Sequence, residues 1–376
     1  MALAELARAG VDGQGSMRAL IQRFVGRMDR MAPADLTQAM RLFVGTNAGP
    51  GEVEAFAGEL AVRARPMLVS EARGAVESLG GIARAAADPF AAGVLARALA
   101  VDGRSAVEVR RRLGTAAVGL MVGAGADADE CAALVAELAA KGACPFEEPE
   151  SDPEGMDEVT EKGMGDVRTA RALQRAAELY ALLGQAAESR GLLERALAMA
   201  PTDAQLLNGV AYSDLERGEV RDLTASMAER AAAARPDDPA VLDTLGFLRY
   251  QQGRFADDRT GTGAISLFRQ ALRLRPNSPS ITTLDHLGDA LWRSGDQQGA
   301  IRSWQQVGVV ARRRYPPELF QRRMSSFQLE RFGFELIPVA QFVRREYGAV
   351  VGRAERKLEQ VAKGEPPDVA DCSATR

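Results

Sequence analysis

The chain has 376 residues, of which only 5% are aromatic, and its formal net charge is −4. A chain of this length holds two or three domains, and its richness in alanine, leucine, arginine and glutamate favours helices over strands. The acidic balance offers no basic field that would attract nucleic acid or an anionic membrane surface. We therefore predict an all-α protein that does not bind nucleic acid.

Three cysteines, Cys131, Cys144 and Cys372, lie far apart in the sequence. Their odd number and wide spacing argue against a disulfide framework and a zinc site, and predict free thiols in a reducing compartment. The first ten residues lack a basic flank followed by an apolar run, so they do not resemble a signal peptide. The longest apolar stretch, 114–126, is too short to span a bilayer. We expect a cytoplasmic protein, or a periplasmic one if the chain is a fragment that lacks its leader.

Residues 1–143 are predicted to form a helical region of their own. Amphipathic patterns of helical period recur along it, separated by Gly and Pro breaks. The clearest patterns cover 16–31, 33–43, 51–65 and 127–141. Residues 88–113, with Gly103 between two apolar stripes, are the best candidate for a helix pair. The region could therefore contain degenerate copies of a helical repeat.

Residues 144–166 are predicted to be an acidic linker. Between Pro145 and Gly163, acidic residues outnumber basic ones eight to one, and Pro and Gly prevent a long helix. An alternative is an acidic segment that docks a basic partner. A solvated linker is the simpler interpretation.

Four segments, 173–184, 207–218, 242–253 and 284–295, share one pattern. Each opens with leucine, has a small residue four positions later and closes with glycine seven positions after that. The small residues are Ala177, Ala211, Gly246 and Gly288, and the closing glycines are Gly184, Gly218, Gly253 and Gly295. A glycine can adopt the left-handed conformation that ends a helix, and a second amphipathic stretch follows each one.

The second stretches carry small and large apolar residues on one face, such as Ala264 and Phe268. This spacing would let the first helix of each unit approach closely and pack against the large residue. Pro201, Pro236 and Pro276 would then end the second helices.

These features resemble the tetratricopeptide repeat, through the Leu-Gly pairs at 245–246 and 287–288, the aromatic Tyr180 and the Ala264 to Phe268 spacing. The resemblance covers 167–314. It implies an α-solenoid of four helix-turn-helix repeats, joined to the additional N-terminal helical region. A DHLGDALW-type unit also resembles repeat proteins of bacteria, which indicates a bacterial setting.

Departures from the repeat pattern are informative. The small positions are 34, 35 and then 42 residues apart, so repeat three carries an insertion, 256–263, which should loop out. Repeat two has Thr224 where a small alanine is usual. Residues 315–376 are predicted to be capping helices and a disordered tail, with 353–363 as the polar-faced terminal helix.

In a tetratricopeptide stack the first helix of each pair lines the concave face. The residues that this mapping places there are Arg171, Gln174, Glu178, Gln205, Asn208, Tyr212, Asp243, Phe247, Tyr250, Thr282, Asp285, Asp289 and Trp292. Aromatic side chains beside carboxylates suit a peptide or protein partner with basic and apolar side chains. The family's clamp for a C-terminal carboxylate is not expected, because the three aspartates would repel it and Asn208 alone fits.

Catalytic sites find no support in the residues. His286 is the only histidine, which removes most histidine-dependent triads and multi-histidine metal sites. The glycine-rich stretch 114–127 lacks the order of a nucleotide-binding loop. Asp257, Asp258 and Arg259 are best explained as a solvated turn. We predict no catalytic residues, no metal and no cofactor.

The sequence therefore predicts a non-enzymatic scaffold that binds a protein or peptide in the concave groove of its repeats. Two alternatives stay open. The helical half before residue 143 could carry its own ligand-binding or enzymatic activity, with the repeats as a targeting arm. The stack could also self-associate into a homo-oligomer.

Overall fold

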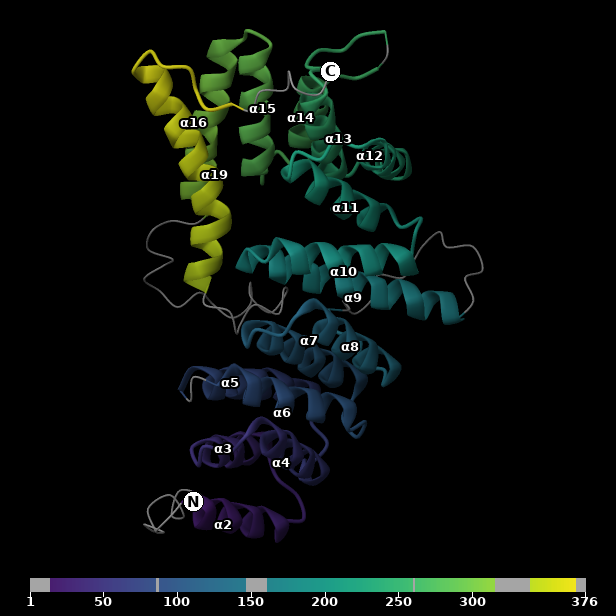
Figure 1. The fold of residues 1–376 in the computed structure, drawn as a ribbon, viewed down its shortest axis with the longest axis vertical. Helices are drawn as coiled ribbons and strands as arrows, with labels where there is room; N and C mark the ends of the chain where they lie inside the picture. The colour runs from purple at the N-terminus through teal and green to yellow at the C-terminus, as the bar shows by residue number, and fades with distance from the viewer. Residues whose placement is uncertain (1–13, 86–87, 147–160, 260, 315–338, 370–376) are drawn as a thin grey trace. The chain divides into compact units, whose positions relative to one another are not determined.

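The computed structural model describes residues 14–85, 88–146, 161–259, 261–314 and 339–369. Every regular element in these ranges is a helix, which confirms the predicted all-α class. By packing, the described residues form two compact units, one up to Leu192 and one from Leu193 onward, except that Val339 falls in the first. Each unit is considered by itself below (Figure 1).

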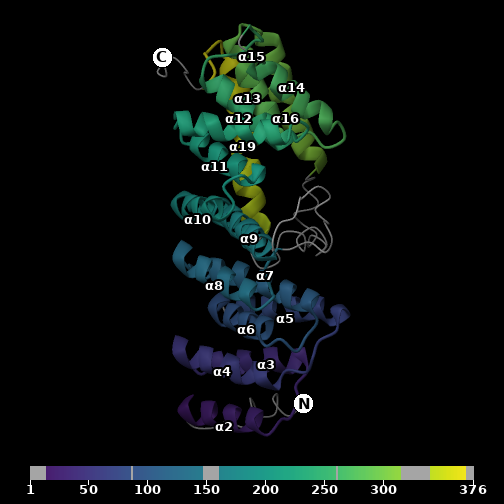
Figure 2. The ribbon, with the colours of Figure 1, turned by 90° about the vertical axis from the view of Figure 1, so that its right-hand side faces the viewer.

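The first unit is a succession of amphipathic helices. They are α2 (Gln14–Gly26), α3 (Pro33–Val44), α4 (Pro50–Arg63), α5 (Val69–Ala85), α6 (Pro89–Val101), α7 (Val107–Gly123), α8 (Ala128–Ala140) and α9 (Glu161–Leu183). Figure 2 shows α5 beside α6, and these two helices are in contact. Proline in the first turn begins α3, α4 and α6, where its fixed backbone angle is already helical. The helices expected at 33–43, 51–65 and 127–141 are therefore present, with ends shifted by one or two residues, whereas the first pattern ends early, at Gly26.

The candidate pair at 88–113 corresponds to α6 and the first part of α7, which pack against each other around Gly103. Glycine in α6 permits this packing, because a Cβ on Gly93 would lie 3.0 Å from two side-chain atoms of Met121. Asp88 begins α6 by accepting a hydrogen bond from the backbone N–H of Ala91, at 2.8 Å. The predicted hairpin is therefore observed.

Helix α9, the first helix of repeat one, belongs to this first unit. The hydroxyl of Tyr180 donates to the carbonyl oxygen of Ala126 at 2.6 Å, next to the start of α8. Cys131 is 1% exposed, and burial raises the pKa of its thiol to about 12. A thiol with such a pKa stays protonated at neutral pH, so Cys131 behaves as the small apolar core residue that its helix predicts.

The stretch expected to be a linker, 144–166, differs at both ends. Cys144 is buried, and the residues from Glu161 onward are part of α9. The acidic residues 147–160 lie outside the described ranges. A break in packing is thus not found at the predicted position, because α9 contacts α7 and α8.

The second unit contains the remaining repeat helices. These are α10 (Ala186–Met199, whose first half falls in the first unit), α11 (Ala204–Glu216), α12 (Asp222–Ala234), α13 (Pro239–Gln251), α14 (Ala264–Leu274), α15 (Ile281–Arg293), α16 (Gln297–Arg314) and α19 (Val339–Ala362). Helices α11 and α12, α13 and α14, and α15 and α16 pack as the pairs of repeats two, three and four. All four closing glycines have positive φ, between 72° and 94°. The predicted helix ends are therefore confirmed.

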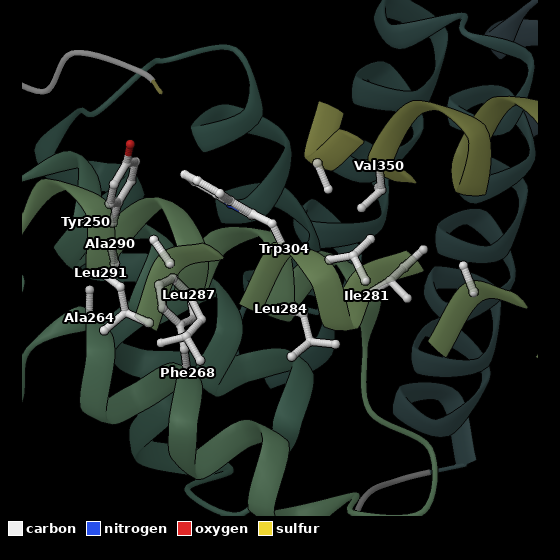
Figure 3. Packing of buried hydrophobic residues seen from close by; sticks show 14 residues of the cluster. Tyr250, Ala264, Phe268, Ile281, Leu284, Leu287, Ala290, Leu291, Trp304 and Val350 are labelled. Carbon is white, nitrogen blue, oxygen red and sulfur yellow. The ribbon is translucent and has the colours of Figure 1, made fainter. Parts of the chain in front are cut away.

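Each of repeats three and four is held by a glycine against a large aromatic ring. A Cβ on Gly246 would lie 2.7 Å from Cε1 of Phe268, and one on Gly288 would overlap Nε1 of Trp304. Phe268 and Trp304 are 0% and 1% exposed, and Figure 3 shows both within one apolar cluster. The small-to-large pairing expected from the sequence is thus what joins the two helices of each repeat.

The two departures noted in the sequence have local explanations. Thr224 is buried and donates from Oγ1 to Oδ2 of Asp214 at 2.8 Å, so its hydroxyl satisfies a buried carboxylate of the partner helix. The insertion forms an exposed turn, in which Asp258 and Gly261 exchange backbone hydrogen bonds. Asp257 accepts from the backbone N–H of Gly263 at 2.8 Å, which ties the turn to the start of α14.

Candidate functional site: an acidic and aromatic face

Three first helices of the second unit, α11, α13 and α15, pack in succession. From them come five side chains that we call the acidic–aromatic face. These are Tyr212, Asp243, Phe247, Asp285 and Asp289. All five were expected to point toward the concave side of the stack.

Aromatic contacts connect the three helices across this face. The rings of Tyr212 and Phe247 have centroids 6.3 Å apart and are tilted by 45°. Phe247 also stacks on the imidazole of His286, at 4.3 Å and an interplanar angle of 6°. These offset and tilted contacts add specific geometry to apolar burial. They place α11, α13 and α15 in a fixed register.

Asp243 and His286 form a buried polar pair between α13 and α15. Nδ1 of His286 lies 3.3 Å from Oδ1 of Asp243, and both side chains are 10% exposed. Burial by itself lowers the pKa of His286, but the charge of Asp243 and the more distant Asp285 and Asp289 raise it above its usual value. The imidazole therefore holds its proton to higher pH than a free histidine.

Helix α19 contacts the acidic part of the face. Nζ of Lys357 lies 2.9 Å from Oδ1 of Asp285 and 2.6 Å from Oδ1 of Asp289. Nε of Arg353 donates to Oδ2 of Asp285 at 3.2 Å. The side chains of Lys357 and Asp285 are only 4% and 2% exposed. The two carboxylates are thus neutralised by the chain's own basic side chains.

Trp304 also contacts the Lys357 ammonium and the Asp289 carboxylate. Its Nε1 donates to Oδ1 of Asp289 at 3.1 Å, and Nζ of Lys357 lies 5.5 Å from its ring centroid. Burial raises the pKa of Asp289 to about 6, although Lys357 counteracts the shift. Lys357 therefore has two carboxylates and an aromatic ring as partners, a favourable setting for a buried ammonium.

Apolar residues of α19 complete the contact. Val350 and Ala354 are 6% and 1% exposed and join the apolar cluster of repeat four, with Val350 visible in Figure 3. Leu358 and Val361 are half-buried against the same cluster. The charge of Arg353 also acts on the phenol of Tyr212, whose pKa is raised chiefly by burial. Helix α19 therefore packs on repeat four through apolar as well as charged side chains.

The sequence mapping placed thirteen residues on an open concave surface, and in the structure they differ in how far they are exposed. Asp243, Tyr250 and Asp285 are 7%, 2% and 1% exposed, so these three do not face open solvent, because their own chain covers them. Arg171 and Gln205 are exposed. The partly buried residues are Gln174, Glu178, Asn208, Tyr212, Phe247, Thr282, Asp289 and Trp292. Arg171, Gln174 and Glu178 belong to the first unit and the others to the second.

Sequence reasoning missed the basic side of the site. Residues 353–363 were expected to cap the stack with a polar face, whereas Arg353 and Lys357 point at the aspartates. A signal was available, because Arg353 and Lys357 are four residues apart, as are Asp285 and Asp289. Two complementary i, i+4 pairs can meet when their helices lie against each other.

Comparison with known proteins agrees with the repeat geometry. A stretch of 97 residues, 25% of this chain, is 35% identical to a TPR repeat-containing protein of Pseudomonas aeruginosa. Over this stretch the chain is therefore similar to a tetratricopeptide repeat protein. It spans only 14% of the length of that relative, and no family model matches it.

Among solved structures, this chain is similar to MamA from Desulfovibrio magneticus RS-1, at 17% identity and a TM-score of 0.35. That match covers 54% of this chain and 96% of the other. MamA of strain MSR-1 is 20% identical, with a TM-score of 0.32, and the match covers 55% of this chain and 99% of that one.

Two further properties bear on function. Within the described ranges, none of the helices is long and apolar enough to cross a membrane. The same ranges hold no group of three or more His, Cys, Asp or Glu residues that could bind a metal ion.

Proposed function

We propose that this protein is a non-enzymatic scaffold that binds a protein or peptide partner with basic and apolar side chains on the acidic–aromatic face. The observation that carries the proposal is the contact with α19. A helix with a lysine, an arginine and several aliphatic residues packs there through two ion-paired carboxylates. The face therefore has the chemistry to hold such a helix.

Residues at the edges of the face support the same function. Gln205 and Thr282 lie in the first turns of α11 and α15 and are exposed and half-buried, respectively. Oδ1 of Asn208 is buried without a hydrogen-bond partner in the described part of the chain. An amide in this position can bond to the backbone of a bound polypeptide, which would satisfy the buried oxygen.

Site-specific photo-crosslinking in cells tests this function. Benzoylphenylalanine is placed at Gln205 or Thr282 in the full chain, and at Arg269, an exposed residue of the second helix α14, as the matched control. We expect a discrete protein adduct from the first two positions and not from Arg269. Equal labelling from all three positions, or adducts from Arg269 alone, would exclude the acidic–aromatic face as the binding surface.

A further inference from the structure

We propose that α19 is a resident ligand of the acidic–aromatic face, and that a partner helix displaces it by supplying the same cation and the same aliphatic residues. The inference rests on the proposed scaffold function. It specifies the partner as an amphipathic helix with a central Lys or Arg, and it makes partner binding a competition with the chain's own segment.

The buried carboxylates set the charge requirement. Asp285 is 2% exposed as a side chain, and its described partners from α19 are Lys357 and Arg353. An occupant without a cation at this point would leave a buried carboxylate unpaired, which is strongly unfavourable. A helix that lacks Lys or Arg is thereby rejected, and this penalty provides specificity in addition to the apolar contact.

The aliphatic residues set the spacing requirement. Val350, Ala354, Lys357, Leu358 and Val361 stand at i, i+4, i+7, i+8 and i+11, which places them on one side of a helix. All five are buried or half-buried. A competing helix therefore needs a basic residue three positions after a small one and followed at once by an aliphatic one.

Among the residues that the structure describes, the other side of α19 makes no comparable contact. Glu355, Arg356 and Glu359 are all exposed. Arg356 is adjacent to Lys357 and has the same charge, yet it stands outside the site. This difference supplies a matched control, because a change at Arg356 alters the charge of the helix without altering its contact with the face.

Helix α19 is covalently tethered to the repeats that it covers. Residues 315–338, a stretch of 24, connect α16 to α19. A tethered segment acts at an effective concentration on the order of millimolar, so it competes with every partner that binds the same residues.

Fluorescence anisotropy tests the competition directly. The probe is a labelled synthetic peptide of residues 345–369, and it is added to the full-length wild type, to Lys357→Glu and to Arg356→Glu. Glutamate at 357 is repelled by Asp285 and Asp289, so α19 should leave the face in that variant alone. We expect the peptide to bind Lys357→Glu at least about tenfold more tightly than it binds the other two proteins. The same peptide with Lys357→Glu should not bind any of them.

Ala354→Glu serves as a second variant, since Ala354 is 1% exposed and a larger, charged side chain there would lift α19 without altering Asp285. Circular dichroism and emission from the tryptophans verify that each variant is folded. Equal peptide affinity for wild type, Arg356→Glu and both disrupted variants would overturn the proposal, as would unfolding of both variants that the peptide does not reverse.

The scaffold function and the resident-ligand proposal fail differently. Absence of crosslinks at Gln205 and Thr282 contradicts the function, whatever the peptide does. Tight peptide binding to Lys357→Glu, with crosslinks equal to wild type, would instead show that the partner does not compete with α19. Light scattering that finds a wild-type dimer and a Lys357→Glu monomer would overturn the proposal that α19 covers the face of its own chain. The face would then be covered by α19 of a second copy.

Discussion

Repeats three and four place an aspartate at the same position and neutralise it differently. Asp243 precedes Gly246 by three residues, and Asp285 precedes Gly288 by three. Asp243 pairs with His286 of the next repeat, whereas Asp285 pairs with Lys357 of α19. A buried carboxylate at this position thus needs a polar partner from the helix that packs against it. For repeat three this partner comes from the following repeat, and for repeat four it comes from α19.

The residue directly after the small glycine also contacts the next helix in both repeats. Phe247, one residue after Gly246, stacks on His286 of α15. Asp289, one residue after Gly288, contacts Lys357 of α19. At this position repeat three is therefore joined to its neighbour by aromatic stacking, and repeat four to α19 by charge. The two contacts should respond differently to mutation and to pH.

The largest effect is expected from Lys357→Met, which removes the cation from two carboxylates. Breaking a buried ion pair on one side costs about 3–5 kcal/mol, because the remaining charge is left unpaired. Urea unfolding, followed by emission from Trp292 and Trp304, the chain's only tryptophans, reports on the second unit. Arg356→Met is the control and should change the unfolding free energy by less than about 0.5 kcal/mol. Equal losses for both variants would mean that Asp285 is readily rehydrated.

Close packing within each repeat gives the next largest effect. An added methyl at Gly288 would overlap Trp304, and one at Gly246 would crowd Phe268. Such overpacking costs about 1–3 kcal/mol, and Gly288→Ala should be the more damaging, because the ring of Trp304 is also fixed by Asp289. Thermal unfolding of both variants checks the order. A Cβ on Gly348 would meet no atom within 4 Å outside the backbone of its own helix. Gly348→Ala should therefore leave the unfolding free energy unchanged or raise it by up to about 1 kcal/mol.

These repeats could be predicted from the sequence because their determinants are local. The closing glycines, the small positions and the large residues of the second helices recur at fixed spacings, and each acts within one helix pair. The contact of Lys357 with Asp285 connects residues 72 positions apart. No helical period encodes which two helices meet over such a separation. The covering of Asp285 by α19 therefore could not be inferred from the repeat pattern.

Thr224 shows an intermediate case. The sequence identified it as unusual for its position, but not its partner Asp214, which is ten residues earlier on the neighbouring helix. The hydroxyl of Thr224 gains its hydrogen-bond partner only when α11 and α12 pack together. An anomaly in a repeat is thus a sign of a compensating residue, whose identity comes from the three-dimensional structure.

Thr224→Val should lower the unfolding free energy by about 1–2 kcal/mol, because the methyl replaces a hydroxyl that donates to a buried carboxylate. The loss is smaller than for Lys357, since Arg217 and Arg221 still pair with Asp214. Thr224→Ser keeps the donor and should lose less than Thr224→Val in the same urea titration. If serine is instead the more damaging of the two, packing of the Thr224 methyl and not the hydrogen bond determines stability at this position.

The smallest effect should distinguish the two aspartate pairs by pH. His286 has a raised pKa in the folded protein, so its contribution is fully present below the unfolded value of about 6.5 and is lost as pH rises through the folded pKa. Above pH 6.5 the unfolding free energy should therefore fall with rising pH, by at most about 1.4 kcal/mol per unit, the slope for one proton.

The sole histidine makes the measurement direct, because its ring protons give a single titration by NMR. That titration should lie above pH 6.5 in the wild type and move lower in Asp243→Asn, where the main opposing charge is gone. His286→Phe should abolish the pH slope in this range, since the pKa of Asp289 is raised only to about 6 and changes the slope of stability with pH mainly below that value. A wild-type titration below 6.5 would mean that burial outweighs the carboxylates, and that repeat three depends on aromatic stacking instead of on charge.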